Sequence, residues 1–232
     1  MGWKTIGRKA IYVVLKPLIN GLVKLGVTPN MVTTIGLLVN IAATIILIIG
    51  AELGDRNDFR YIGWAGATLL FGGLFDMIDG RLAREGKMVS DYGALYDSVL
   101  DRYSELFMFF GICYYLVSHN YFWSSIFAFI AMIGSVMVSY TRARAEGLGV
   151  IPSVGLMQRP ERILIVAISA ILCGLFSKVI GQDIKIEVDW FPVPLFETIT
   201  IFTFPIFILA IWANLTALKR LVYSKQKLDI QK

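Results

Sequence analysis

Charged residues, cysteine and histidine are scarce in this sequence. Only 17% of its 232 residues are charged, two are cysteines and one is a histidine, whereas 56% are hydrophobic. A soluble chain of this length exposes too much surface to hide such an excess of apolar residues. Cys113 and Cys173 lie in apolar stretches, which excludes a disulfide framework or a thiolate metal site. His119 falls in a predicted loop, where we expect it to be in solvent rather than catalytic.

Long apolar stretches follow one another along the chain with no soluble domain between them. Each is about 18 residues or more, enough to cross the hydrocarbon layer of a bilayer. The predicted spans are Pro29–Leu53, Tyr61–Ala83, Tyr92–Val117, Phe122–Tyr140, Ile163–Ile180 and Leu195–Leu218. We therefore predict an all-α, polytopic membrane protein whose six transmembrane helices form one domain over residues 27–223, followed by a cytoplasmic tail, residues 224–232.

The first 26 residues are predicted to form an amphipathic helix at the membrane surface. At helical spacing, apolar residues such as Trp3 and Ile6 share one arc, and basic residues such as Lys4 and Lys9 lie largely on the other. This pattern suits a helix beside anionic lipid headgroups. The alternative is a cationic flank that only fixes the topology.

Basic residues are distributed unevenly among the segments between the predicted spans. Seventeen lysines and arginines fall in the N-terminal segment, the second and fourth connections and the C-terminal tail, against four in the other three loops. Because basic residues concentrate on the cytoplasmic side of a membrane, both termini and these two connections are predicted to be cytoplasmic. This bias explains the net charge of +5 better than nucleic-acid binding does.

Four aspartates near the second connection are the strongest chemical signal. Asp76 and Asp79 are three residues apart on one predicted helix, and Asp97 and Asp101 are four apart on the next, so each pair occupies one helix face. Four carboxylates facing one another repel unless cations lie between them, and such hard oxygen ligands favour Mg²⁺ or Mn²⁺. The alternatives are helix caps or a pair between Asp101 and Arg102. Acidic residues within spans are costly, which favours a metal site, and two such ions would hold a diphosphate.

The segment between the two acidic pairs suits a phosphate ligand. Gly80 lets a ligand approach the backbone, Ala83 is small, and Arg84 can bind a phosphate with its planar guanidinium. Ala83 is also explained by helix packing. A cation pathway would not favour Arg84, which weakens the interpretation of the aspartates as part of a divalent-cation transporter.

These residues resemble the signature of the CDP-alcohol phosphotransferase (phosphatidyltransferase) family. The match runs Asp76-x2-Asp79-Gly80-x2-Ala83-Arg84-x8-Gly93-x3-Asp97-x3-Asp101. The resemblance implies six transmembrane helices, a homodimer, two divalent metal ions per subunit and displacement of CMP from a CDP-linked alcohol by another hydroxyl group. It implies that the four aspartates bind metal and that Asp101 is also the catalytic base. The residues that it assigns to the CDP moiety are Asn30, Met31, Val32, Thr33, Gly80, Ala83, Arg84 and Ser90.

Four arginines in the fourth connection favour a phosphorylated acceptor. Arg142 and Arg144 lie at the end of one span, and Arg159 and Arg162 share a helix face at the start of the next. Arginine binds phosphate with two parallel hydrogen bonds, so we expect the four to form an anion pocket beside the aspartates. The alternative is that they only fix the topology. Lysine would do that equally well, yet this connection uses arginine alone.

The same connection resembles the prokaryotic phosphatidylinositol-phosphate synthases, a subfamily that joins CDP-diacylglycerol to inositol 1-phosphate. The resemblance rests on Tyr-x-Arg-Ala-Arg-Ala-Glu followed by Arg-Pro-Glu-Arg. It implies a multi-pass enzyme of phospholipid biosynthesis in the cell (inner) membrane, surrounded by membrane lipids, with a cytoplasmic active site. Residues 147–157 are not matched, and Arg142 stands where lysine is common in that subfamily. The nearest enzymatic alternative is a phosphatidylglycerophosphate synthase, whose acceptor also carries a phosphate.

Overall fold

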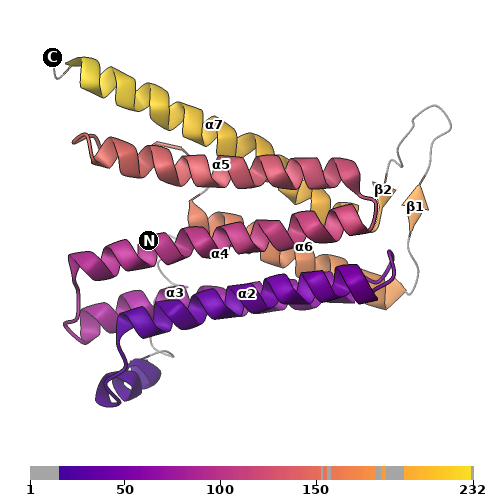
Figure 1. Cartoon of the computed structure of the whole chain (residues 1–232), viewed down its shortest axis with the longest axis horizontal. Helices are drawn as coiled ribbons and strands as arrows, with labels where there is room; N and C mark the ends of the chain where they lie inside the picture. Colours follow the sequence, from indigo (N-terminus) through magenta and orange to yellow (C-terminus); the bar gives the residue numbers. More distant parts are fainter. Residues whose placement is uncertain (1–15, 153, 156–157, 181–183, 187–195, 231–232) are drawn as a thin grey trace, which may run out of the picture.

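A computed structural model shows a bundle of long helices (Figure 1). The structure describes residues 16–152, 154–155, 158–180, 184–186 and 196–230. A short helix over residues 16–24 comes first. The long helices are α2 (Pro29–Leu53), α3 (Arg60–Glu85), α4 (Asp91–Ser118), α5 (Phe122–Glu146), α6 (Arg159–Ile180) and α7 (Thr200–Ile230). The two-residue strands β1 (Lys185–Ile186) and β2 (Phe196–Glu197) pair in antiparallel fashion. The predicted all-α membrane fold is confirmed.

Five of the long helices are apolar and long enough to cross a membrane, namely α2, α3, α5, α6 and α7 within the described residues. Helix α4 is as long as these but carries more charge, because Asp97, Asp101, Arg102 and Glu105 all lie on it. It nevertheless packs within the bundle, against α2 and α5. Six spans therefore stay a prediction, although all six predicted segments are helical.

Three predicted spans differ from the structure at their ends, mainly because a helix can continue beyond its apolar stretch. Helix α5 continues beyond Tyr140 to Glu146, and α6 begins at Arg159 rather than Ile163. Helix α7 begins at Thr200 rather than Leu195 and continues to Ile230, so residues 224–230 of the predicted cytoplasmic tail are helical. Lysine, leucine and glutamine are good helix formers, which lets α7 continue past its apolar part.

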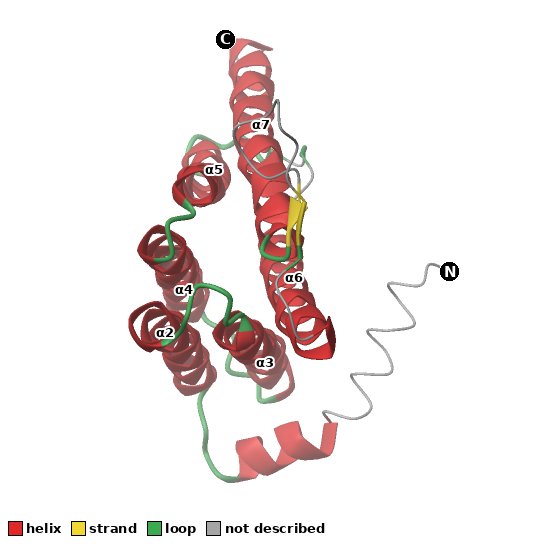
Figure 2. Ribbon diagram, turned by 90° about the vertical axis from the view of Figure 1, so that its right-hand side faces the viewer, coloured by secondary structure: helices red, strands yellow, loops and turns green. Residues whose placement is uncertain are grey.

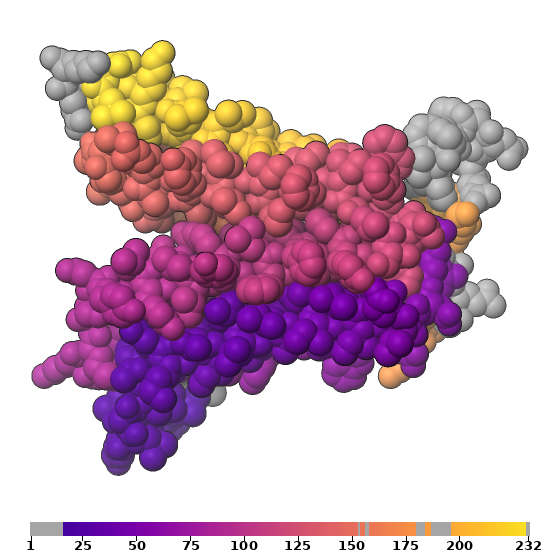
Figure 3. Space-filling view, in the orientation of Figure 1, coloured from indigo at the N-terminus to yellow at the C-terminus, as the bar shows by residue number. Residues whose placement is uncertain are grey.

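The short helix over residues 16–24 lies across the end of the bundle rather than along it (Figures 2 and 3). Its Ile19 is fully buried and packs with Val32 of α2 and with Ile78 and Leu82 of α3. This contact holds the helix at the end of the bundle where the aspartates lie. Residues 1–15, most of the predicted surface helix, fall outside the described residues.

The predicted separation of basic and less basic connections corresponds to the two ends of the bundle. The short helix, the α3–α4 connection and the C-terminal end of α7 lie at one end, and the α2–α3 connection and both strands lie at the other (Figure 1). We call these the basic end and the strand end. His119 lies at the strand end and is buried, with its Nε2 3.2 Å from the carbonyl oxygen of Gly50, so the prediction that it is in solvent is wrong.

Helices α3 and α6 approach so closely that only glycine fits at their contact. A Cβ atom added to Gly66 of α3 would lie 2.7 Å from the carbonyl oxygen of Ala167 and 2.7 Å from Cβ of Ala170, both on α6. Gly63 and Gly174 meet backbone to backbone nearby. Small residues at such contacts let transmembrane helices pack backbone to backbone. This packing positions the start of α6, with its arginines, against α3.

We predict that Gly66→Ala lowers the free energy of unfolding by about 1–3 kcal/mol, because the added methyl group would push α6 away from α3. Thermal unfolding of the purified protein in detergent measures the change. Gly73→Ala on the same helix is the matched control, since a Cβ there meets no atom within 4 Å. We expect the control to be neutral or slightly stabilising. Equal midpoints for the two variants would contradict the role of this contact.

Candidate active site

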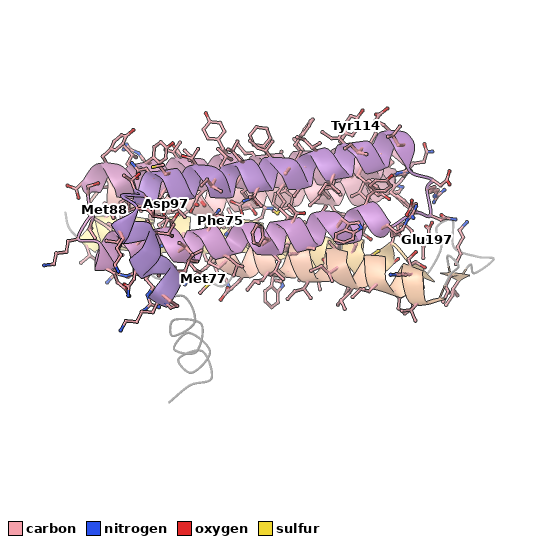
Figure 4. The ribbon with its side chains drawn as sticks, turned by 90° about the horizontal axis from the view of Figure 1, so that it is seen from below. Phe75, Met77, Met88, Asp97, Tyr114 and Glu197 are labelled. Carbon is pink, nitrogen blue, oxygen red and sulfur yellow. The ribbon has the colours of Figure 1, made fainter. Side chains whose placement is uncertain are left out.

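The turn between α3 and α4 brings the two acidic pairs to the basic end of the bundle. Five residues, 86–90, separate the helices, and Lys87 adopts a positive φ of 54° in this turn. Ser90 caps α4 by accepting a hydrogen bond of 3.0 Å from the backbone N–H of Gly93. Figure 4 shows Asp97 at this end, near Met88, with Tyr114 and Glu197 at the other end. The predicted antiparallel arrangement of the two acidic pairs is therefore present.

Asp79 is the most enclosed of the four aspartates. It is 5% exposed, and its Oδ2 accepts a hydrogen bond of 2.8 Å from Thr33 Oγ1 of α2. Thr28 is the N-cap of α2, and its side chain accepts a hydrogen bond from the backbone N–H of Met31. Pro29 occupies the first position of the helix. Thr33, predicted to contact the CDP moiety, thus also fixes the orientation of a predicted metal ligand.

Arg159 connects both acidic helices to the start of α6. Its Nη1 lies 2.6 Å from Asp76 Oδ2 on α3 and 2.7 Å from Asp101 Oδ1 on α4. The side chain of Arg159 is 13% exposed, so these contacts are largely removed from water. Arg102, next to Asp101 in sequence, lies farther from that carboxylate, at 3.7 Å. A single guanidinium group therefore lies between carboxylates of the two predicted pairs.

The carboxylates fit a divalent metal by their chemistry, although they are not arranged around one. Among the described residues, no group of three or more Asp, Glu, His or Cys side chains has the arrangement to hold a metal ion. Arg159 instead supplies the positive charge that clustered carboxylates need. The donors are all hard oxygens on adjoining helices, which is the ligand chemistry of Mg²⁺ and Mn²⁺. The role of the four aspartates as metal ligands stays a prediction.

A cavity of about 340 Å³ lies on the α2 side of the aspartates. We call it the nucleotide cavity, after the ligand predicted for the residues that line it. Of the eight residues assigned to the CDP moiety, six line it: Asn30, Thr33, Gly80, Ala83, Arg84 and Ser90. Asp79 and Asp97 line it as well. A Cβ added to Gly80 would meet only Arg84 Nη1, at 3.6 Å, so this part of the wall is open.

Met31 and Val32 do not line the nucleotide cavity. Met31 is 52% exposed on the outer surface of α2, and Val32 is buried against Ile19. Consecutive helical residues point in different directions, so a run of four cannot face one site. Of this run, only Asn30 and Thr33 line the cavity, and the assignment of the run to the CDP moiety stays a prediction.

A second cavity, of about 200 Å³, lies on the other side of Asp101, among α4, α5, α6 and α7. We call it the arginine cavity. Asp101 lines it together with Arg142, Arg159 and Arg162, three of the four arginines predicted to bind the acceptor phosphate. Arg144 lies in a different hollow, between α5 and α7. Because α5 continues through both residues, Arg142 and Arg144 are about 200° apart around the helix axis.

The arginines of this cavity differ in how far their hydrogen-bonding capacity is already used. Arg162 is buried and pairs with buried Glu105, with Nε 2.7 Å from Oε1 and Nη2 3.1 Å from Oε2. Arg142 is exposed and pairs with Glu146 one turn away, at 2.8 Å. Arg142 can exchange that partner for an incoming anion at little cost, because an exposed pair contributes little to stability.

Two residues of the site were not predicted. Arg220 of α7 lines the arginine cavity, where its Nη1 donates a 2.8 Å hydrogen bond to the carbonyl oxygen of Val138. It is one of the seventeen basic residues that predict the topology, and it continues the buried stripe of Ala213 and Ala217 at helical spacing. Glu105 continues the stripe of Asp97 and Asp101 in the same way. Helical spacing was therefore the signal for both.

The chain is similar to known proteins over most of its length. Residues 26–214 match the sequence profile of the CDP-alcohol phosphatidyltransferases. The chain is 36% identical over 172 residues to an archaetidylinositol phosphate synthase of Pyrococcus horikoshii, covering 73% of this chain and 81% of that protein. It is 31% identical over 176 residues to a phosphatidylinositol phosphate synthase of Mycobacteroides abscessus, covering 74% of each.

Solved structures of the phosphatidylinositol phosphate synthase of Mycobacterium tuberculosis have the same fold. The structure in complex with manganese and citrate superimposes with a TM-score of 0.71 at 26% identity, covering 90% of this chain and 87% of that one. The structure with CDP-DAG bound superimposes with a TM-score of 0.70 at 27% identity, covering 90% and 92%.

We predict that Arg159→Gln destabilises the metal-free protein by about 3 kcal/mol, because two carboxylates held away from water lose their shared cation. Unfolding is measured in detergent with a chelator present. Arg102→Gln is the control, because its longer and more exposed contact with Asp101 contributes less than about 1 kcal/mol. A loss no larger than that of the control would contradict the bridging role of Arg159.

Proposed function

We propose that this chain, which belongs to the CDP-alcohol phosphatidyltransferase family, transfers the phosphatidyl group of CDP-diacylglycerol to inositol 1-phosphate. Family membership makes it a membrane-embedded transferase of phospholipid biosynthesis. The proposal adds the acceptor, the residues that bind each substrate and the requirement for a divalent metal. The products are phosphatidylinositol phosphate and CMP.

The observation that carries the proposal is the position of the aspartates between two different cavities. Asp79 and Asp97 line the nucleotide cavity, together with six of the residues predicted to bind the CDP moiety. Asp101 lines the arginine cavity, and Arg159 contacts both Asp101 and Asp76. An anionic donor and an anionic acceptor therefore each have a cavity, and the carboxylates lie where the two substrates would meet.

The donor is assigned to the nucleotide cavity. Arg84 provides a guanidinium for the diphosphate, and Gly80 leaves room beside the backbone. Asp76, Asp79, Asp97 and Asp101 would hold two Mg²⁺ or Mn²⁺ ions per subunit, which neutralise the diphosphate when bound. The relative from M. tuberculosis was solved with CDP-DAG and, separately, with manganese. Both observations support this assignment.

Asp101 is assigned the role of base. It is the aspartate of the signature that lines the arginine cavity, where the acceptor would bind. Its carboxylate takes the proton of the acceptor hydroxyl as that oxygen bonds to the phosphorus bearing the diacylglycerol. The bond from this phosphorus to the oxygen bridging it to CMP breaks, and CMP leaves with the electron pair.

The acceptor phosphate is assigned to the arginine cavity. Arg142 and Arg159 offer guanidinium groups there, and buried Arg162 and Arg220 add to its positive charge. Inositol 1-phosphate carries both the phosphate and the hydroxyl groups that such a cavity requires. Glycerol 3-phosphate shares the phosphate and is the competing acceptor. A cation pathway is disfavoured because Arg159 lies between the carboxylates.

The orientation of the enzyme and its assembly are also proposed. The basic end of the bundle carries both cavities, and its excess of arginine and lysine supports a cytoplasmic location. The water-soluble acceptor would then reach the site from the cytoplasm, and the lipid donor from within the membrane. The homodimer implied by the resemblance stays a prediction.

We predict that Asp101→Asn lowers the rate of CMP release by about 100-fold or more, because an amide cannot take the acceptor proton. Release of labelled CMP from CDP-diacylglycerol is measured with inositol 1-phosphate and Mg²⁺. Asp58→Asn at the strand end, where Asp58 pairs with exposed Arg60, controls for loss of a carboxylate elsewhere. CMP release at the wild-type rate by Asp101→Asn would show that the base is wrongly assigned.

We predict that inositol 1-phosphate is the better acceptor when it and glycerol 3-phosphate are offered in parallel with labelled CDP-diacylglycerol. Arg142→Gln is expected to raise KM for inositol 1-phosphate about tenfold, the effect of losing one hydrogen bond to a charged group. Arg60→Gln at the strand end is the matched control, with KM unchanged. Incorporation of glycerol phosphate alone would reject the inositol assignment while leaving the phosphatidyl-transfer reaction intact.

A further inference from the structure

The hollow that contains Arg144 is separate from both the nucleotide cavity and the arginine cavity. It has a volume of about 610 Å³ and lies between the last turns of α5 and the C-terminal part of α7. No aspartate of the signature lines it, and it shares no lining residue with the arginine cavity. At the basic end the end of α7 lies beside the end of α5 (Figures 1 and 3). Its size is within the range of about 300–1,000 Å³ typical of ligand sites.

Two cations that border this hollow have no partner among the residues that the structure describes. Arg144 comes from α5 and Lys225 from α7, and neither forms an ion pair or hydrogen bond with any residue that the structure describes. Arg142, half a helical turn away, is by contrast paired with Glu146. Asp229 also lines the hollow, so the charges that line it sum to +1. The site therefore favours an anionic group.

The remaining walls are mostly apolar, with Thr141 and Ser224 as polar exceptions. Leu148 follows α5, and Leu221 and Leu228 lie on α7, with Leu148 and Leu221 about half exposed. Tyr140, at the predicted end of a span, is 58% exposed beside them. Exposed tyrosine is typical of the boundary between the hydrocarbon and the headgroups. The hollow thus combines cations with an apolar surface beside the predicted end of a span.

We propose that this hollow binds an anionic phospholipid that is not a substrate. Its phosphate contacts Arg144 and Lys225, and an acyl chain lies along Leu221 toward the membrane. Basic pockets between transmembrane helices bind lipid headgroups in this manner. Arg144 then has a lipid-binding role, while Arg142, on the opposite face of α5, serves the arginine cavity. The proposal does not depend on the identity of the acceptor.

The test measures lipid binding by the intact purified protein. Native mass spectrometry in detergent compares phosphatidylglycerol with phosphatidylcholine of the same acyl chains. We expect tighter binding of phosphatidylglycerol, and about fivefold weaker binding in Arg144→Gln and in Lys225→Gln, since one basic residue contributes about 1 kcal/mol at a membrane surface. Lys227→Gln is the matched control, because Lys227 stacks over the Tyr223 ring at 5.8 Å and does not line the hollow.

Four outcomes would overturn the proposal. Equal binding of the two lipids would remove the preference for an anionic headgroup. Equal weakening by Lys227→Gln would show a diffuse charge effect. Displacement of the lipid by inositol 1-phosphate would assign Arg144 to the acceptor instead. If Arg144→Gln and Lys225→Gln changed the monomer–dimer balance without changing the lipid affinity, a second copy of the chain would occupy the hollow.

Discussion

The contact of Arg159 with Asp76 and Asp101 is the interaction on which the site depends. Carboxylates within apolar helices repel one another and are poorly solvated, so they cannot gather without a cation. Arg159 supplies one from α6, a helix far from α3 and α4 in sequence. Its position follows in turn from the close glycine-mediated packing of α6 on α3.

A second ion pair one turn along α6 extends this arrangement. Arg162 pairs with Glu105 of α4, both buried. Helices α3 and α6, α2 and α3, and α2 and α4 pack closely among the described residues, whereas long side chains make the connection between α4 and α6. Two arginines from one face of α6 thus reach two acidic residues on one face of α4, Asp101 and Glu105. A buried pair of this kind contributes little net stability, but removing either partner is costly, which fixes how α4 and α6 pair.

The sequence was sufficient to predict those parts of the site that depend on spacing within one helix. The two aspartate pairs, each on one face of its helix, and the cavity wall formed by Gly80 and Arg84 are examples. It was not sufficient where the outcome depends on how far a helix extends. Because α5 runs to Glu146, Arg142 and Arg144 point to different hollows. Because α7 runs past its apolar part, Arg220 enters the arginine cavity. The partners of Arg159 and Arg162 depend on packing between helices, which spacing along the chain does not determine.

The two-cavity arrangement bears on how a membrane enzyme joins a lipid to a water-soluble compound. A single cavity would have to accept both anions, and their charges would repel. Here the nucleotide cavity and the arginine cavity share no lining residue, and different aspartates line each of them. On the proposed assignment, the acceptor hydroxyl reaches the phosphorus of the bound donor from the side of the arginine cavity. The two substrates therefore do not compete for the same cations. The guanidinium group of Arg159 contacts Asp76 of α3 and Asp101 of α4. Its position is therefore sensitive to the charge of the ligands that bind on either side of these two carboxylates.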